Sequence, residues 1–476
     1  MSSAGMEYSL KGILREVLSY KSGLFGILLL IFLVVLSIVT IITIPYNTAI
    51  NLWRGEEGIW LENPKNAQPV WVKYIVGKNL PENIVLDSKK AGTIGITKAL
   101  TEIPGTDFKK VYMEFTFTYD YDDFPNEVNI FFDAKYTKNA PILKIYIIKP
   151  GGIKVDLTNY ILRKPDDILY LSINPIVSQN LLIHASSVVG KQLEEELPIE
   201  MALFAVEDES LANVGTLKVL KGVYKIVIEG TLFGKESDVD AKVVIYGKVW
   251  GWAGTDHMRR DLGIALLWGT PVAMSFGLTA SLMITILHLS IATISGYYGG
   301  WVDSLIQRLT EIYMIIPFLP FLIMIATFYK LDIWILLAVI IVLSIFGGGI
   351  KSTRALVMQI REYPYIEAAK VYGASNLRII FLYIIPKILP PVIPGLIGAV
   401  PSYVFLEAGL SFLGLGDPYL PTWGKVINDA YNNGALYKGY YYWVLEPAFM
   451  LILTAFAFSF LGFALDKIVN PKLREV

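Results

Sequence analysis

The longest apolar runs in this chain predict helices that cross a membrane. One run, from Leu24 to Ile44, holds 21 residues without a charge, or roughly 31 Å as an α-helix, which is enough to cross a bilayer core. Five further runs occupy residues 272–295, 310–329, 333–350, 384–412 and 444–465. A cleaved signal peptide is the alternative for the first run. An anchor is favoured because the run is longer than a usual signal-peptide core and no A-x-A site follows it.

Between the first two apolar runs the hydrophobic pattern changes from a helical period to that of strands. Apolar and polar residues alternate at 113–121, 127–136, 143–149, 222–233 and 241–250. Period two, punctuated by Pro, Gly, Asn and Asp, is typical of antiparallel strands. We therefore predict a β-sandwich at 46–255, since about 210 residues can bury a core of their own.

Together the patterns predict an α-helical polytopic membrane protein of about six transmembrane helices with an inserted all-β extracytoplasmic domain. The predicted order is a cytoplasmic N-terminus, a first span, the β-rich domain, a five-helix membrane core containing a cytoplasmic loop, and a cytoplasmic tail. The corresponding residues are 1–23, 24–44, 46–255, 256–466 with the loop at 351–383, and 467–476.

The positions of Lys and Arg set the predicted orientation, because cytoplasmic loops of membrane proteins carry an excess of them. The N-terminal flank and the tail are both basic, with Lys11, Arg15, Lys21, Lys467, Lys472 and Arg474. The loop at 351–383 is also basic, whereas the short loop at 330–332 offers only Lys330. Both termini and the 351–383 loop are therefore predicted to be cytoplasmic.

The composition supports a membrane protein and excludes several kinds of site. Of 476 residues, 54% are hydrophobic and 17% charged, with a mean hydropathy of +0.51. The absence of Cys excludes disulfides and thiolate chemistry, and the three His, at positions 184, 257 and 288, are far apart in sequence, so a metal site is not expected. The net charge of −1 gives no sign of a nucleic-acid partner. We find no catalytic constellation.

A charged, interrupted stretch between two apolar runs is the most specific feature of the sequence. It reads YIEAAKVYGASNLRIIFLYIIP from Tyr365 to Pro386. Pro364 suits the first turn of a helix, Gly373 is placed to end that helix, and Ser375 can cap the next one. Polar side chains and a broken backbone are not tolerated in lipid, so this stretch is predicted to form an exposed cytoplasmic knob.

The spacing within this stretch resembles the EAA loop of ABC importer permeases, whose coupling helix docks on a separate ATPase subunit. E-A-A is followed by three residues, a Gly, nine residues and an aromatic-x-aliphatic-Pro ending. The resemblance implies that ATPase docking involves Tyr365, Ile366, Glu367, Ala368, Ala369, Lys370, Tyr372, Gly373, Ala374 and Ser375. Within this set we expect Glu367 and Lys370 to make polar contacts and Ile366, Ala369 and Tyr372 to fill an apolar cleft of the ATPase.

Further motifs are similar to the dipeptide/oligopeptide/nickel class of these permeases, of the second-permease type. They include NPKNAQPVW at 63–71, GTDHMRRD at 254–261 and EAGLSFLGLG at 407–416. The GTD motif implies a collar at the membrane surface made of Gly254, Thr255, Asp256, Arg260 and Asp261. Arg259 stands where the class has Gly; if a positive φ is required there, Arg costs about 1 kcal/mol or more. The insert at roughly 72–250 has no counterpart in the class.

The resemblance implies a type I ABC importer-like fold and a set of partners. These are a second homologous permease in a heterodimer, two ATP-binding subunits on the cytoplasmic side, an extracellular solute-binding protein and the lipid membrane. No cofactor is expected in this chain, because it has no G-x-x-x-x-G-K-[ST] and the partner subunits would bind ATP and Mg. The chain is thus expected to be non-catalytic.

The fifth span is the leading candidate for the translocation pathway. It is crowded with prolines, including Pro390, Pro394 and Pro401, and it carries Glu407. Prolines disfavour a straight helix, and broken helices at membrane depth are tolerated where they line a cavity. Kinks that serve packing are the alternative for the prolines. An interfacial or helix-capping role is the alternative for Glu407.

Two other classes of function are weighed against the permease. A membrane-anchored sensor or enzyme would need clustered acid, base or metal-binding residues in 46–255, and an ATP-independent channel or transporter would need more charges within the spans. Neither pattern is evident. The cargo stays open between oligopeptides, oligosaccharides and a metal such as nickel.

Overall fold

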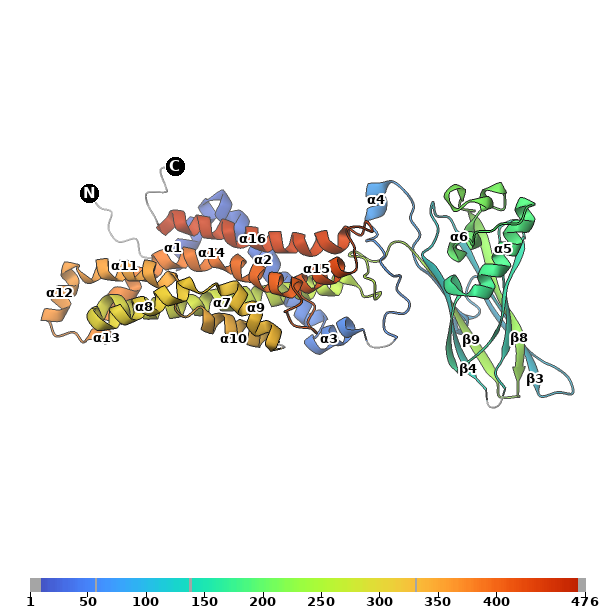
Figure 1. Cartoon of the computed structure of the whole chain (residues 1–476), viewed down its shortest axis with the longest axis horizontal. Coiled ribbons are helices and arrows are strands. Elements are labelled where there is room, and N and C mark those ends of the chain that lie inside the picture. Colours follow the sequence, from blue (N-terminus) through green and yellow to red (C-terminus); the bar gives the residue numbers. More distant parts are fainter. Residues whose placement is uncertain (1–9, 56–57, 137–138, 330–331, 470–476) are drawn as a thin grey trace. The chain divides into compact units, whose positions relative to one another are not determined.

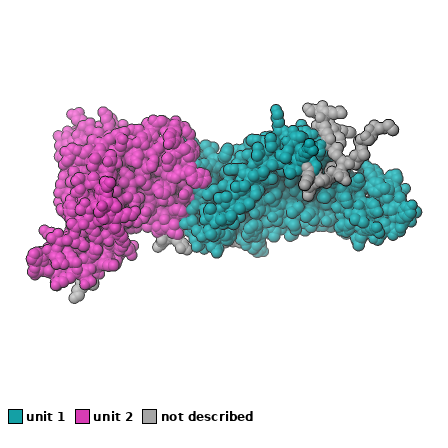
Figure 2. Space-filling view, turned by 180° about the vertical axis from the view of Figure 1, so that it is seen from behind, with its two compact units in different colours: residues 1–54, 262–476 teal, residues 55–261 magenta. Residues whose placement is uncertain are grey.

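The computed structural model describes residues 10–55, 58–136, 139–329 and 332–469. The chain divides into two compact units (Figure 2). The membrane unit holds residues 1–54 and 262–476, and the β unit holds residues 55–261. The predicted bounds of 46–255 therefore differ from these: Tyr46–Arg54 forms a helix, α3, of the membrane unit, and the GTD motif belongs wholly to the β unit.

Two antiparallel sheets build the β unit, in the orders β1-β9-β4-β7 and β2-β3-β8-β5-β6. The strands are β1 (Ile84–Asp87), β2 (Ile96–Glu102), β3 (Phe108–Tyr119), β4 (Glu127–Lys135), β5 (Ile142–Ile148), β6 (Lys154–Ile161), β7 (Asp166–Tyr170), β8 (Gly222–Phe233) and β9 (Asp238–Tyr246). Alternate residues of β3, such as Val111, Met113 and Phe115, are buried in one core, as period two requires. All five strands expected from the sequence are present.

The β unit is not all-β, because it also contains helices, one of which, α5 (Pro175–Val189), packs against β6 (Figure 1). The other two are α4 (Val72–Val76) and α6 (Ile199–Phe204). Local signals define α5: the Asn174 side chain accepts hydrogen bonds from the amides of Ile176 and Val177, and Pro175 occupies the first turn. Gly190 ends the helix at a φ of +76°.

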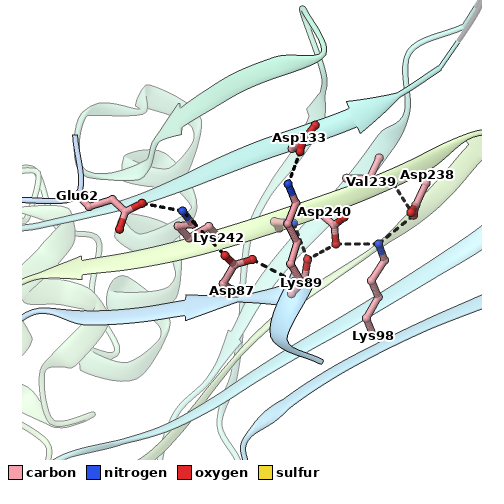
Figure 3. Close-up of polar contacts among 11 residues, drawn as sticks. Glu62, Asp87, Lys89, Lys98, Asp133, Asp238, Val239, Asp240 and Lys242 are labelled. Carbon is pink, nitrogen blue, oxygen red and sulfur yellow. Dashed lines mark hydrogen bonds and ion pairs between the residues drawn. The ribbon is translucent and has the colours of Figure 1, made fainter. Parts of the chain in front are cut away.

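An ion network joins the two sheets at one edge (Figure 3). Lys98 of β2 lies 2.9 Å from Asp238 and 2.8 Å from Asp240 of β9, which belongs to the other sheet. Ser88 donates to Asp240 over 2.6 Å. Burial opposes the ionisation of Asp240, but the hydrogen bonds from Lys98 and Ser88 outweigh it and hold the Asp240 pKa below its ordinary value.

The membrane unit is helical. Its long helices are α2 (Lys21–Thr43), α7 (Leu262–Tyr298), α14 (Ile385–Phe412) and α16 (Tyr442–Val469). Shorter helices are α1 (Leu10–Ser19), α8 (Gly300–Ile315), α9 (Phe318–Phe328), α10 (Ile333–Leu343), α11 (Gly349–Arg361), α12 (Pro364–Val371), α13 (Asn376–Ile379) and α15 (Trp423–Asn432). α14 packs against α7 and α16, and α16 packs against α2 (Figure 1).

Four helical runs in the described part are long and apolar enough to cross a membrane: α2, α7, Asn376–Phe412 and α16. The predicted span at 310–329 is instead the pair α8 and α9, bent by 75°, because Ile316 precedes Pro317 and adopts an extended conformation, with ψ 125°. The predicted span at 333–350 is split as well. α10 has 11 residues, and it ends before the glycines at 347–349, which leaves it too short to cross a bilayer alone.

Candidate functional site

The knob expected at 365–373 is a short helix, α12, with clear local causes for both ends. Pro364 occupies its first turn after an extended Tyr363. At its other end Gly373 has a φ of +78°. Its amide donates to Lys370 O and the amide of Ala374 donates to Ala369 O, each over 3.0 Å, which is the Schellman arrangement. Ser375 then caps α13 by accepting from the Arg378 amide.

The two faces of α12 have different environments. Ile366 is fully buried and Ala369 nearly so, in a cluster of this chain's own residues that includes Tyr297 and Ile379. The expectation that Ile366 and Ala369 fill a cleft of the ATPase is therefore wrong, since both are already covered. Tyr372, by contrast, is 90% exposed. The other exposed residues of this surface are Tyr365, Glu367, Ala368, Lys370, Val371, Gly373 and Ser375.

The exposed face combines opposite charges with apolar groups. Glu367 and Lys370 lie one turn apart, and Val371, which sequence reasoning did not single out, is 86% exposed next to Tyr372. Partial burial raises the pKa of Tyr365 above its ordinary value of 10, at which the phenol is already neutral at physiological pH. Such a face suits docking into a protein surface with an apolar centre and a polar rim.

Both flanks of the loop are tied to residues 296–303, where α7 ends and α8 begins, through contacts that we call the α7 clamp: Tyr297, Asp303, Arg354, Arg361 and Asn376. Arg354 forms a two-pronged ion pair with Asp303, with one contact of 2.5 Å. Arg361 Nη1 donates to Gly296 O and Tyr297 O, each over 3.2 Å. The Tyr297 hydroxyl donates to Asn376 Oδ1 over 2.8 Å. The coupling loop and the end of α7 are therefore one hydrogen-bonded body.

Sequence reasoning did not find the clamp. Arg354 and Arg361 lie in the basic loop at 351–383, and Asp303 lies some 50 residues away in sequence. The available signal was one acidic residue directly after a long apolar run, facing a basic loop. This acidic residue indicates an ion pair only when the apolar run before it and the 351–383 loop are known to lie side by side.

The proline-rich helix α14 runs unbroken from Ile385 to Phe412, so the expected break is wrong. The irregularity is a single π-helical turn at Ile380–Ile384, just ahead of Pro386. Packing against α7 and α16 on either side holds the proline-containing segment helical.

The candidate pathway residues face the unit's own core. Pro394 and Pro401 are buried, Pro390 is half-buried, and Glu407 is 3% exposed, with Ser411 Oγ donating to its carboxylate over 2.7 Å. Glu407 is thus a satisfied buried carboxyl within this chain. The uncovered part of α14 carries the small residues Gly395, Gly398, Ser402 and Gly409, together with the large apolar Leu389 and Phe405.

The GTD motif forms a compact turn that closes the base of the β unit. Thr255 Oγ1 donates to Pro64 O over 2.7 Å and accepts from the Ala67 amide over 3.0 Å. Asp256 accepts from the Arg260 amide over 2.8 Å and from its Nε over 2.5 Å. Gly254 supplies a φ of +74°, and Thr255 forms a bridge with Asp261. The stretches at 63–71 and 254–261 are therefore joined, although the sandwich separates them in sequence.

Arg259 does adopt a positive φ, of 66°. Its guanidinium donates to Asn63 O over 2.6 Å, pairs with Glu127 of β4, and lies 4.4 Å from the centre of the Tyr246 ring of β9. The side-chain contacts with the sandwich thus offset the backbone strain of about 1 kcal/mol. Arg259, which stands where the class has Gly, therefore connects strands β4 and β9 of the sandwich to the 63–71 segment.

Among the described residues, no group of three or more His, Asp or Glu side chains is arranged to hold a metal ion. Fold and site together define a polytopic membrane protein with an exposed helical knob between two of its membrane segments.

Comparison with known proteins gives the family. Residues 288–475 match the family model described as "Binding-protein-dependent transport system inner membrane component". The dipeptide transport system permease protein DppC of Bacillus subtilis is 31% identical over 227 residues, which cover 47% of this chain and 69% of the relative. The oligopeptide transport system permease protein OppC of Escherichia coli is 33% identical over 223 residues, or 46% and 72%.

A peptidoglycan transport system permease protein of Agrobacterium fabrum, YejE, is 30% identical over 183 residues, which cover 38% of this chain and 48% of the relative. The chain belongs to the family of binding-protein-dependent transport system inner membrane components. It is a permease subunit of an ABC importer, of the second-permease type in the dipeptide and oligopeptide class, and it is a non-catalytic transmembrane component.

Proposed function

We propose that this chain forms half of the translocation pathway of an ATP-driven importer. A second, different permease would complete the pathway, two ATP-binding subunits would dock on the cytoplasmic side, and an extracellular solute-binding protein would deliver the cargo. The observation that carries this proposal is the exposed face of α12, where Glu367, Lys370, Val371 and Tyr372 lie uncovered on a loop tied firmly to the membrane unit.

Energy transfer in this proposal begins outside the chain. The partner subunits bind ATP and Mg, and their closure displaces α12 through its exposed face. Since Arg354, Arg361 and Asn376 tie the loop to residues 296–303, the end of α7 moves with it. α7 packs against α14, so the displacement reaches the uncovered glycine-bearing face of α14, which we assign to the pathway or to the second permease.

The orientation follows from the basic residues. Arg15 and Lys21 flank α2, and Lys351, Arg354 and Lys370 flank or belong to the coupling loop, which supports cytoplasmic placement for the loop and for both chain ends. The same prediction also used four residues whose side chains lie outside the part of the chain that the structure describes: Lys11, Lys330, Lys472 and Arg474. The β unit is then extracytoplasmic.

Peptides are the favoured cargo. The relatives named above carry the words dipeptide, oligopeptide and peptidoglycan in their names. Oligosaccharides are the second candidate, and no residue of α14 distinguishes the two.

The proposal is tested by co-expressing the chain with its genomic neighbours, purifying it through a tag, and assaying the reconstituted complex for uptake of a labelled peptide library. We expect two ATP-binding subunits and a second permease to copurify, and uptake to need ATP and the solute-binding protein. Uptake of oligosaccharides but not of peptides would contradict the assignment of peptides as the cargo. A chain that purifies without any ATP-binding subunit in several detergents would overturn the partners.

A further inference from the structure

The β unit exposes a patch of aromatic and aliphatic side chains around α4, which we call the α4 patch. It consists of Trp71, Tyr74, Ile75, Val76 and Trp252, with exposed fractions of 44, 86, 74, 51 and 53%. Large apolar groups that cluster in solvent usually mark an interaction site. The mechanism proposed above makes no use of this patch.

Hydrogen bonds between the 68–71 and 250–252 segments hold the patch in a defined conformation. The Trp71 indole donates to Trp252 O over 2.9 Å, and the Val70 amide donates to Gly251 O over 2.9 Å. The Trp250 amide donates to Gln68 O over 2.8 Å. The outgoing and returning segments of the β unit are thus paired directly beneath the patch.

The chain path keeps the patch near the start of a membrane helix. Trp252 lies three residues before Thr255, and Thr255 is bridged to Asp261, which α7 follows directly. Three residues extend about 11 Å at most and bridged residues lie about 5 Å apart, so the Trp252 backbone is within about 16 Å of Asp261. The predicted span begins at residue 272, about 17 Å of helix beyond Asp261, so the Trp252 backbone is within about 33 Å of the residue where that span begins.

The chemistry favours lipid over a protein surface. The segment WVKYIVGK at 71–78 contains Lys73, which is paired with Glu82 over 2.6 Å, and the exposed Lys78, and Trp, Tyr and Lys are the side chains that settle at the lipid headgroup level. Tyr74, Ile75 and Val76 are consecutive in a helix, so they point about 100° apart from one another. One rigid partner surface meets one helix face, whereas fluid lipid can surround all three side chains.

We propose that the α4 patch is an interfacial membrane anchor, which inserts into the headgroup region of the outer leaflet and holds the β unit at the bilayer surface. This anchor is independent of what the chain transports and of its ATPase partners.

The test exploits the absence of Cys from the chain, since one introduced Cys is the only labelling site. Full-length Ile75→Cys carries a nitroxide label in lipid nanodiscs of phosphatidylcholine and phosphatidylglycerol. Accessibility to lipid-soluble oxygen and to a water-soluble nickel chelate is measured by electron paramagnetic resonance. Tyr74→Cys is a second probe. The matched control is Ile183→Cys on α5, an isoleucine of the same unit that is 68% exposed.

We expect the labels at 74 and 75 to lose nickel accessibility and gain oxygen accessibility relative to 183. Equal nickel accessibility at all three positions would overturn the proposal. Loss of access to both reagents at 75 would also overturn it, because the site would then be covered by protein. A label that is aqueous in the chain alone and becomes protected only when the solute-binding protein is added would reassign the patch to that protein.

Discussion

Ile366 and Tyr372 are six residues apart on one short stretch, and they belong to different interfaces. Ile366 is fully buried in this chain's own cluster, whereas Tyr372 is 90% exposed. Ile366 therefore holds the loop in place, whereas Tyr372 is available to contact the proposed ATPase partner. Arg259 shows a similar division, because its backbone is strained while its side chain stabilises the β unit.

Truncation at position 366 is expected to lower stability, whereas truncation at position 372 is expected to weaken binding of the ATPase. Ile366→Ala should lower the stability of the loop by about 2–4 kcal/mol, because it leaves a cavity in packed surroundings. Tyr372→Ala should change stability by about 0.5 kcal/mol or less, yet weaken ATPase binding. Thermal unfolding of the chain and affinity for the ATP-binding subunits measure the two effects. A stability loss at 372 with unchanged affinity would contradict the assignment.

Replacing Arg259 tests whether its contacts outweigh its strain. Arg259→Gly should relieve about 1 kcal/mol of backbone strain but leave Glu127 and Asn63 O without the guanidinium, for a net loss of about 1–3 kcal/mol in the β unit. Arg259→Lys should not restore it, because an ammonium cannot match the planar fork. The readout is the melting temperature of the β unit, with the half-exposed neighbour Met258→Ala as control. Stabilisation by Gly would show that strain dominates.

Helix ends and strands could be predicted from the sequence, because the interactions that determine them are local. Pro364, Gly373 and Ser375 define the ends of α12, and period two gives the strands, because these cues act within a few residues. Burial of Ile366 could not be read from the sequence, since it depends on Tyr297, some 70 residues away. The span itself was predicted correctly, but the expected break in α14 was wrong for the same reason: α7 and α16 hold a proline-rich segment helical against its local preference.

The α7 clamp gives an element-scale prediction about coupling. Arg354→Ala and Asp303→Ala should each reduce transport, and the double variant should lose less than the sum of the two, with a coupling energy of about 1–2 kcal/mol for this half-buried pair. ATP hydrolysis by the docked subunits should persist without transport. Arg308→Ala is the control, because its contact with Glu311, at 3.4 Å, is exposed. Additive losses at 303 and 354 would contradict a shared clamp.

At the scale of the whole molecule, the β unit should respond to pH separately from the membrane unit. Hydrogen bonds from Lys225 and Tyr112, each over 2.8 Å, hold the pKa of Glu114 below its ordinary 4.5, and Asp240 is likewise lowered from 3.8. A depressed pKa stabilises the folded state above the unfolded value and ceases to do so as pH falls.

We therefore expect the melting temperature of the β unit to stay level from about pH 7 to 5 and to fall below about pH 4.5. Glu114→Gln should lower it at neutral pH and flatten the acid slope. Removal of the exposed Glu236 by Glu236→Gln serves as the control and should do neither. A Glu114→Gln variant with an unchanged acid slope would contradict the role of this carboxylate.

The exposed face of α12 is proposed as the surface on which the ATP-binding subunit docks. The most direct measurement places a photo-crosslinker on Tyr372→Cys, the sole Cys of the chain, in the assembled importer, and identifies the product by mass spectrometry. Tyr437→Cys, at a residue of the same unit that is 96% exposed, is the control. We expect crosslinks to the ATP-binding subunit from 372 and none from 437. Crosslinks from 437 only, or from neither position, would contradict it.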